Sequence, residues 1–111
     1  MTYSRLLLCD LLGERGIEKC LYLDCDTLIV NYGLDEFYDM PLEGKYAAAV
    51  DEVSMMCFNR TEMNDCGVSR YFNAGVVLFN IKEILRDGIN NEFIKLLKEP
   101  SDFMLTRGYS D

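Results

Sequence analysis

The sequence predicts a layered α/β domain, in which short apolar strands alternate with helices along the chain. Two features support this fold class. Several apolar runs have the length of a strand and end in polar residues, and the segments around them carry the cap and stop residues of helices. The chain has 111 residues, of which 50% are hydrophobic. That is enough for one small domain with a buried core, and not enough for two.

The N-terminal part predicts a helix followed by a strand. Residues 3–12 fit a helix, with Thr2 as its N-cap and Gly13 as its stop. The apolar run 20–23 predicts the first strand, and residues 27–30 are expected to continue in an extended conformation. The apolar face of the helix is built from leucines: Leu6, Leu7, Leu8, Leu11 and Leu12.

The middle of the chain predicts two further strands around a long loop. Residues 34–38 fit one short helical turn, and residues 46–50 form a second apolar strand. A third strand is predicted over 71–80, interrupted at 73–75 by Asn-Ala-Gly. The apolar residues within 53–70 recur at no regular spacing, so no helix or strand is predicted there. A loop longer than about 12 residues within a compact domain usually serves as a lid or a binding loop.

Two helices are predicted near the end of the chain. The first covers 81–86 and is capped by Asn80. The second ends at Lys98 and is capped by Asn90 or Asn91, with a proline shortly after its end. From residue 101 onward the pattern fades, so no element is predicted there.

Composition excludes several classes of function. The net charge of −8 disfavours a nucleic-acid groove, which needs a basic stripe. The absence of histidine excludes a histidine-based triad or metal ligand within this sequence. Five cysteines without CxxC spacing make a zinc site or a disulfide framework unlikely. No apolar run approaches the ~20 residues of a transmembrane helix, and no signal peptide is recognised, so a cytoplasmic location with reduced thiols is expected.

The most unusual feature is a pair of acids, Asp24 and Asp26, directly after the first strand. Acids at the end of a buried strand need a partner, because an isolated carboxylate in apolar surroundings is costly. At a spacing of i, i+2 they lie on one side of an extended chain, where they can bind a hard divalent cation. The alternative is that they merely end the strand and cap the next turn.

Other polar residues also fall at strand ends or interruptions. Asp51 and Glu52 follow the second strand, and Asn73 interrupts the third. In open α/β sheets ligands bind at strand ends, so one concave site can collect these residues with the first pair of acids. Asp51 and Glu52 either face an acceptor or are solvated in a loop. The aromatic residues near these ends are expected in the core: Tyr22, Tyr71 and Phe72.

Four segments resemble one family in the same order. They are Thr2-Tyr-Ser-Arg-Leu6, Tyr22-Leu-Asp-Cys-Asp-Thr-Leu-Ile-Val30, Tyr71-Phe-Asn-Ala-Gly-Val-Val-Leu-Phe-Asn80 and the terminal Tyr109-Ser-Asp111. Together they resemble the motifs of glycosyltransferase family 8, which are retaining enzymes similar to lipopolysaccharide galactosyl- and glucosyltransferases. The resemblance implies a partial GT-A fold, with a mixed sheet flanked by helices.

The resemblance also implies roles for individual residues. In the family, the Asp-x-Asp pair holds Mn²⁺ or Mg²⁺ against the diphosphate of a UDP-sugar. The resemblance therefore implies that Asp24 and Asp26 bind the metal. It also implies that Asp24 contacts the donor. The donor would be bound further by Arg5, Asn73, Ala74 and Gly75, and Asp111 would act near the reacting carbon. The alternatives are a solvated Arg5 on the helix surface and a simple strand bulge at 73–75.

By this resemblance, residues 1–111 are the central part of one glycosyltransferase domain. The family's N-terminal nucleotide-binding strand and its C-terminal metal- and diphosphate-binding element have no counterpart here. The implied reaction transfers a hexose to a hydroxyl of a carbohydrate or glycolipid, in surface polysaccharide or lipopolysaccharide synthesis. Peripheral membrane contact would come through the missing regions. This piece alone is expected to be inactive. The alternatives are a truncated non-catalytic remnant and, more weakly, a nucleotidyltransferase, which would need a glycine-rich phosphate loop.

Overall fold

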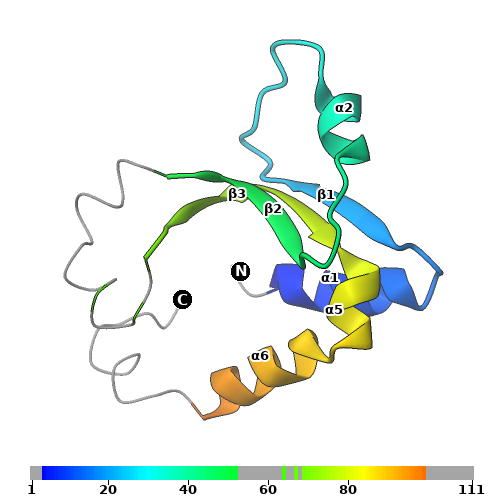
Figure 1. The fold of residues 1–111 in the computed structure, drawn as a ribbon, viewed down its shortest axis with the longest axis vertical. Helices are drawn as coiled ribbons and strands as arrows, with labels where there is room; N and C mark the ends of the chain where they lie inside the picture. Colours follow the sequence, from blue (N-terminus) through cyan, green and yellow to red (C-terminus); the bar gives the residue numbers. More distant parts are fainter. Residues whose placement is uncertain (1–3, 53–63, 65–66, 68, 100–111) are drawn as a thin grey trace. The chain divides into compact units, whose positions relative to one another are not determined.

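The computed structural model describes residues 4–52, 64, 67 and 69–99, drawn in colour in Figure 1. The chain divides into two compact units. We call Cys20–Phe79 the sheet unit, and Met1–Lys19 together with Asn80–Asp111 the helical unit. Each unit is described by itself. The long loop predicted over 53–70, a candidate lid or binding loop, falls largely outside the described residues.

The sheet unit is built on three strands, β1 (Lys19–Leu23), β2 (Ala47–Asp51) and β3 (Phe72–Asn80). Their order is β1-β3-β2, so β3 is the central strand (Figure 1). β2 and β3 pair in antiparallel orientation. The apolar runs therefore predicted all three strands correctly to within a residue or two. The buried residues of this unit include Leu42, Val77 and Leu78, and the last two lie in the second half of the central strand β3.

The register of β2 and β3 changes beside the Asn-Ala-Gly segment. Ala49 pairs with Val77 and Asp51 pairs with Phe72, so one residue of β2 lies opposite four residues of β3. The three additional residues on β3 form a bulge-like irregularity, although β3 itself continues through it. The prediction that residues 73–75 interrupt the strand itself was therefore wrong. The strand remains extended, and it is the pairing with β2 that is broken.

The segment between β1 and β2 contains α2 (Leu34–Asp39), which matches the predicted helical turn. Asp35 and Glu36 lie in its first turn, where negative charge is favoured by the helix dipole. Residues 27–30 form no strand, and Leu28 and Val30 expose 80% and 83% of their surface. The extended continuation of β1 thus ends earlier than predicted, at the turn that begins with Asp24.

The helical unit packs α1 (Ser4–Gly13), α5 (Ile81–Arg86) and α6 (Ile89–Lys98) against one another. The predicted leucine face of α1 is only partly correct, because Leu7 and Leu11 are 53% and 58% exposed while Cys9 is buried. Gly13 explains the close packing of α1 on α5: a Cβ at this position would lie 2.1 Å from Leu85 Cδ1. Gly13 is therefore the last residue of the helix and a packing residue, not a stop beyond it.

The cap predictions have mixed outcomes. Asn80 caps α5 as predicted, since its side chain accepts a hydrogen bond from Glu83 N at 3.4 Å. For α6 the prediction of Asn90 or Asn91 was wrong, because Gly88 is the N-cap. Gly88 has φ 67°, a conformation that glycine adopts at little cost, and it lets the chain leave α5 and begin α6 at once. Asn90 then falls inside the helix and is buried.

None of the helices described is long and apolar enough to span a membrane.

Candidate functional site

Asp24 is held at the end of β1 by contacts from both its side chain and its backbone. The Tyr22 hydroxyl donates a hydrogen bond to Asp24 Oδ1 at 2.7 Å. The Asp24 backbone N–H donates to the Gly75 carbonyl at 2.8 Å. The end of β1 therefore lies beside the irregular part of β3, and the two sequence motifs that carry Asp24 and Gly75 meet at one place.

The two acids lie in a turn and not along an extended strand. Thr27 N donates to the Asp24 carbonyl at 3.0 Å, which closes a turn with Cys25 and Asp26 at its centre. The premise that a strand pleat aligns Asp24 and Asp26 was therefore wrong, because β1 ends at Leu23. Asp24 is half-buried, whereas Asp26 is exposed at the third position of the turn.

Gly75 allows the carboxylate of Asp24 to approach the backbone of β3. A Cβ at position 75 would lie 2.7 Å from Asp24 Oδ2 and 3.2 Å from Asn73 Oδ1. Both distances are shorter than ordinary van der Waals contact. Gly75 therefore leaves room for the side chains of two other candidate site residues, Asp24 and Asn73.

Asn73 is oriented by two partners that define its amide. Its Oδ1 accepts from Gly75 N at 2.8 Å, and its Nδ2 donates to Glu52 Oε2 at 3.3 Å. An acceptor and a donor contact of this kind assign the oxygen and the nitrogen unambiguously. One N–H of the amide and one lone pair of its oxygen remain available to a ligand.

Asp51, the last residue of β2, and Glu52, which follows it, both make contacts that hold the strand end in place. Asp51 forms an ion pair with Arg70, which raises the pKa of Arg70 above its ordinary value through a hydrogen bond and charge attraction. Glu52 N donates to the Tyr71 carbonyl at 2.9 Å, and the Glu52 side chain contacts Asn73. The alternative that both acids are merely solvated in a loop therefore leaves these contacts out of account.

Substitution of Gly75 by alanine is expected to destabilise the fold by about 1–3 kcal/mol, the usual cost of forcing extra atoms into a packed site. The new Cβ would displace the Asp24 carboxylate and press on Asn73 Oδ1. Urea denaturation measures the change. In an Asp24→Ala background the penalty should shrink, because the nearest obstructing atoms are gone; an equal penalty in both backgrounds would contradict the geometry.

The thiols near the site are expected to differ in reactivity. Cys25 is exposed in the turn, Cys20 is half-buried on β1, and Cys9 is buried on α1. Burial raises the pKa of the Cys20 thiol, so less reactive thiolate is present at neutral pH. Iodoacetamide labelling followed by peptide mass analysis should modify Cys25 first, Cys20 more slowly and Cys9 last. Equal rates at Cys20 and Cys25 would contradict this order.

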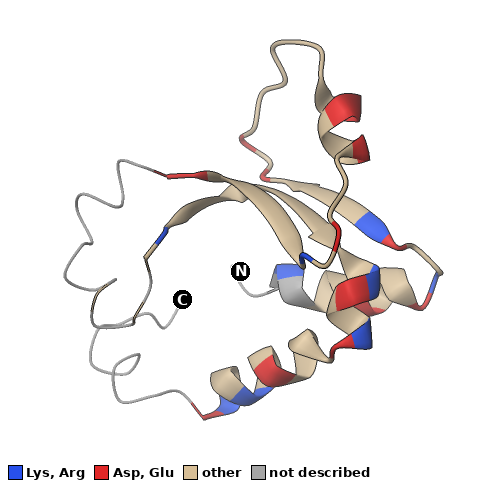
Figure 2. Ribbon diagram, viewed as in Figure 1, with Lys and Arg blue, Asp and Glu red and all other residues tan. Residues whose placement is uncertain are grey.

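The donor set suits a hard cation. Carboxylate oxygens are what Mg²⁺ and Mn²⁺ prefer, and Asp24 and Asp26 supply them from one turn. Acidic segments lie at strand ends in Figure 2, while most of β2 and β3 is uncharged. Among the residues described, no three acidic or thiol side chains form a cluster that could hold a metal ion by themselves. The two acids fit part of a coordination shell.

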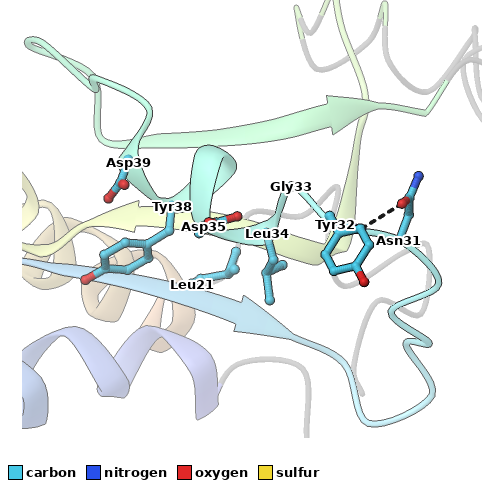
Figure 3. Close-up of a pocket in the computed structure, with 8 residues that line it drawn as sticks. All are labelled: Leu21, Asn31, Tyr32, Gly33, Leu34, Asp35, Tyr38 and Asp39. Atoms are coloured by element: carbon cyan, nitrogen blue, oxygen red, sulfur yellow. Dashed lines mark hydrogen bonds between the residues drawn. The ribbon is translucent and has the colours of Figure 1, made fainter.

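A separate hollow of about 520 Å³ lies between β1 and the segment around α2. Figure 3 shows Leu21, Leu34 and Tyr38 around it. Side chains alternate along a strand, so Leu21 lies on the face of β1 opposite to that of Tyr22. The hollow is therefore on the other side of β1 from the Tyr22–Asp24 contact, and it is not part of the candidate site.

The sheet unit brings together Asp24, Asp26, Asn73 and Gly75, with the exposed Ala74 between the last two. Arg5 lies on α1 in the helical unit, and Asp111 lies outside the described residues.

Sequence reasoning missed the roles of Tyr22 and Glu52. Tyr22 was assigned to the core, although its i, i+2 spacing from Asp24 placed both side chains on one face. Tyr71 and Phe72 are 39% and 53% exposed, so they are not core residues either.

The sequence profile described as Glycosyl transferase family 8 matches residues 1–108. The chain belongs to glycosyltransferase family 8. Its Asp-x-Asp turn and its Asn-Ala-Gly strand both lie inside the matched region. The family membership predicted from the four motifs is therefore confirmed.

Several known proteins are similar to this family 8 chain. A lipopolysaccharide 1,2-glucosyltransferase of Escherichia coli is 32% identical over 101 residues, covering 89% of the chain and 29% of that protein. A lipopolysaccharide 1,3-galactosyltransferase of Salmonella typhimurium is 30% identical, covering 89% and 30%. The apo structure of the WbbM bifunctional glycosyltransferase aligns with a TM-score of 0.75 at 26% identity, covering 87% of this chain and 20% of that one.

The chain thus spans about a third or less of the length of these relatives. The structural likeness to a glycosyltransferase agrees with the predicted α/β class and partial GT-A fold.

Proposed function

We propose that this family 8 domain transfers a hexose from a UDP-sugar to a hydroxyl of a carbohydrate or glycolipid acceptor, with retention at the anomeric carbon. The pathway we propose is the cytoplasmic synthesis of a surface polysaccharide or lipopolysaccharide. Two relatives named as lipopolysaccharide sugar transferases support this assignment. The structural observation that carries it is the joining of Asp24 to Gly75, because it places the acidic turn beside the Asn-Ala-Gly strand.

In this proposal Asp24 and Asp26 hold Mn²⁺ or Mg²⁺. When bound, the cation supplies positive charge that stabilises the departing diphosphate. The protein contributes the position of the carboxylates. Asp24 is fixed by Tyr22 and by the backbone of Gly75, whereas Asp26 presents its carboxylate to solvent from the turn. A preoriented ligand costs less reorganisation during the reaction.

The remaining residues would recognise the donor. Asn73 offers one N–H and one lone pair, which can pair with a sugar hydroxyl. Ala74 is exposed next to it and would line the donor sugar. Arg5 would bind phosphate or hydroxyl oxygens through its planar guanidinium. Asp111 would bind the sugar hydroxyls near the reacting carbon.

The deciding experiment measures UDP release from UDP-glucose and UDP-galactose by the purified intact protein, with Mn²⁺ and with EDTA. Mn²⁺-dependent release from either donor is expected, and NMR of the product should show the donor's anomeric configuration. No metal-dependent release from either sugar nucleotide would contradict the proposal.

A second readout does not require turnover. Cys25 stands between Asp24 and Asp26, so occupation of the turn by Mn²⁺ and UDP should slow its alkylation. Cys20, on β1, serves as the internal control and should react at an unchanged rate. Unprotected Cys25 at saturating Mn²⁺ and UDP would count against the metal assignment.

A further inference from the structure

Asp24 has a neighbour, Tyr22, to which the family resemblance assigned no role. Tyr22 lies on β1, two residues before Asp24, and both residues are half-buried. Residues at this spacing share one face of a strand. The phenol hydroxyl donates to Asp24 Oδ1 at 2.7 Å, the ordinary distance of an O–H···O hydrogen bond.

The hydrogen bond restricts the carboxylate of Asp24 in a specific way. Oδ1 is engaged by Tyr22, while Oδ2 lies against the backbone of Gly75. The Asp24 backbone is tied to the same residue through its N–H. The plane of the carboxylate is thus fixed from two sides. By contrast, Asp26 is exposed, so the rigidity of the pair comes from Asp24.

We propose that Tyr22 is a positioning residue, which orients the Asp24 carboxylate for a divalent cation. This inference rests on the proposed function, because it takes Asp24 as a metal ligand. Tyr22 does not touch the cation or the substrate in this assignment; it acts through Asp24. Partners that hydrogen-bond a metal ligand typically change metal affinity by about 10–100-fold when removed.

The test is a titration of the purified intact protein with Mn²⁺ alone, in which the EPR signal of free Mn²⁺ gives the affinity. Tyr22→Phe removes one oxygen atom and is expected to weaken Mn²⁺ binding by about tenfold or more. Tyr32→Phe is the matched control, because Tyr32 is fully exposed, and its affinity should equal that of the unmodified protein. Thermal unfolding confirms that both variants are folded.

Two further variants separate positioning from a general structural effect. In an Asp24→Asn background, Tyr22→Phe should change Mn²⁺ affinity by less than about twofold, since residues that act through one contact are not additive. Tyr22→4-aminophenylalanine keeps a donor at the same position and should restore most of the affinity. This variant also keeps the test decisive if Tyr22→Phe does not fold.

The possible failures are distinguishable. If Asp24→Asn weakens Mn²⁺ binding while Tyr22→Phe does not, the role of Tyr22 is refuted and the metal assignment stands. The role is also refuted if Tyr22→Phe weakens binding equally in both backgrounds, because Tyr22 then does not act through Asp24. If Asp24→Asn binds Mn²⁺ as tightly as the unmodified protein, the metal assignment itself fails, and the inference about Tyr22 fails with it.

Discussion

Replacement of Asp26 by asparagine is expected to lower Mn²⁺-dependent sugar transfer by a factor of about 10²–10³, the usual cost of losing one group that stabilises developing charge. Asparagine keeps the shape of the side chain but removes the charge that a divalent cation needs. Asp26 is exposed in the turn that Asp24 and Thr27 close. The free energy of unfolding should therefore change by no more than about 0.5 kcal/mol. Initial rates of UDP release and urea denaturation measure the two quantities.

Asp39→Asn is the matched control for this prediction. Asp39 is also exposed, and it ends α2, away from the acidic turn in sequence. The same loss of one negative charge at this position should leave transfer unchanged. If Asp26→Asn retained full activity, the assignment of the metal to the Asp-x-Asp turn would be wrong. An equal loss in both variants would show that overall charge, and not the turn, controls the rate.

The elements that could be predicted from the sequence are those whose cause is local. β1, β2 and β3 follow from apolar runs bounded by polar residues, and α2 follows its turn residues. The N-cap of α5 follows directly from the chemistry of Asn80. The site residues Asp24 and Gly75 could be found because an acid and a glycine are unusual in or beside apolar segments that predict strands. Finding them did not require knowledge of their contacts.

The parts that could not be predicted depend on contacts between distant residues. The three additional residues of β3 opposite β2 are set by strand register, which neither strand specifies alone. The hydrogen bond from the Asp24 N–H to the Gly75 carbonyl joins two segments that are far apart in the sequence, and neither segment specifies it alone. The N-cap of α6 is Gly88 and not one of the two nearby asparagines. The short connection from α5 requires a left-handed backbone conformation at this position, which glycine adopts at little cost.

Leu78→Ala is expected to be the most destabilising single substitution discussed, at about 2–5 kcal/mol. Leu78 is 0% exposed in the second half of β3, the central strand. Truncation removes apolar surface from the core and leaves a cavity that its neighbours fill only in part. Domains are stable by only about 5–15 kcal/mol, so this loss should be large enough to shift the urea midpoint strongly.

Leu28→Ala provides the matched control, because it removes the same atoms from a side chain that is 80% exposed. Its effect should stay within about 0.5 kcal/mol, and equal midpoint shifts in the two variants would contradict the burial of Leu78. The same strand links this core position to the site: Leu78 pairs with Ala48 in the regular part of the ladder, and the irregular part begins beyond Val77. β3 carries both Leu78 and Gly75, so lost packing at Leu78 is expected to loosen the strand that holds Gly75 beside Asp24. Under conditions in which Leu78→Ala is still folded, its affinity for Mn²⁺ should therefore fall below that of Leu28→Ala.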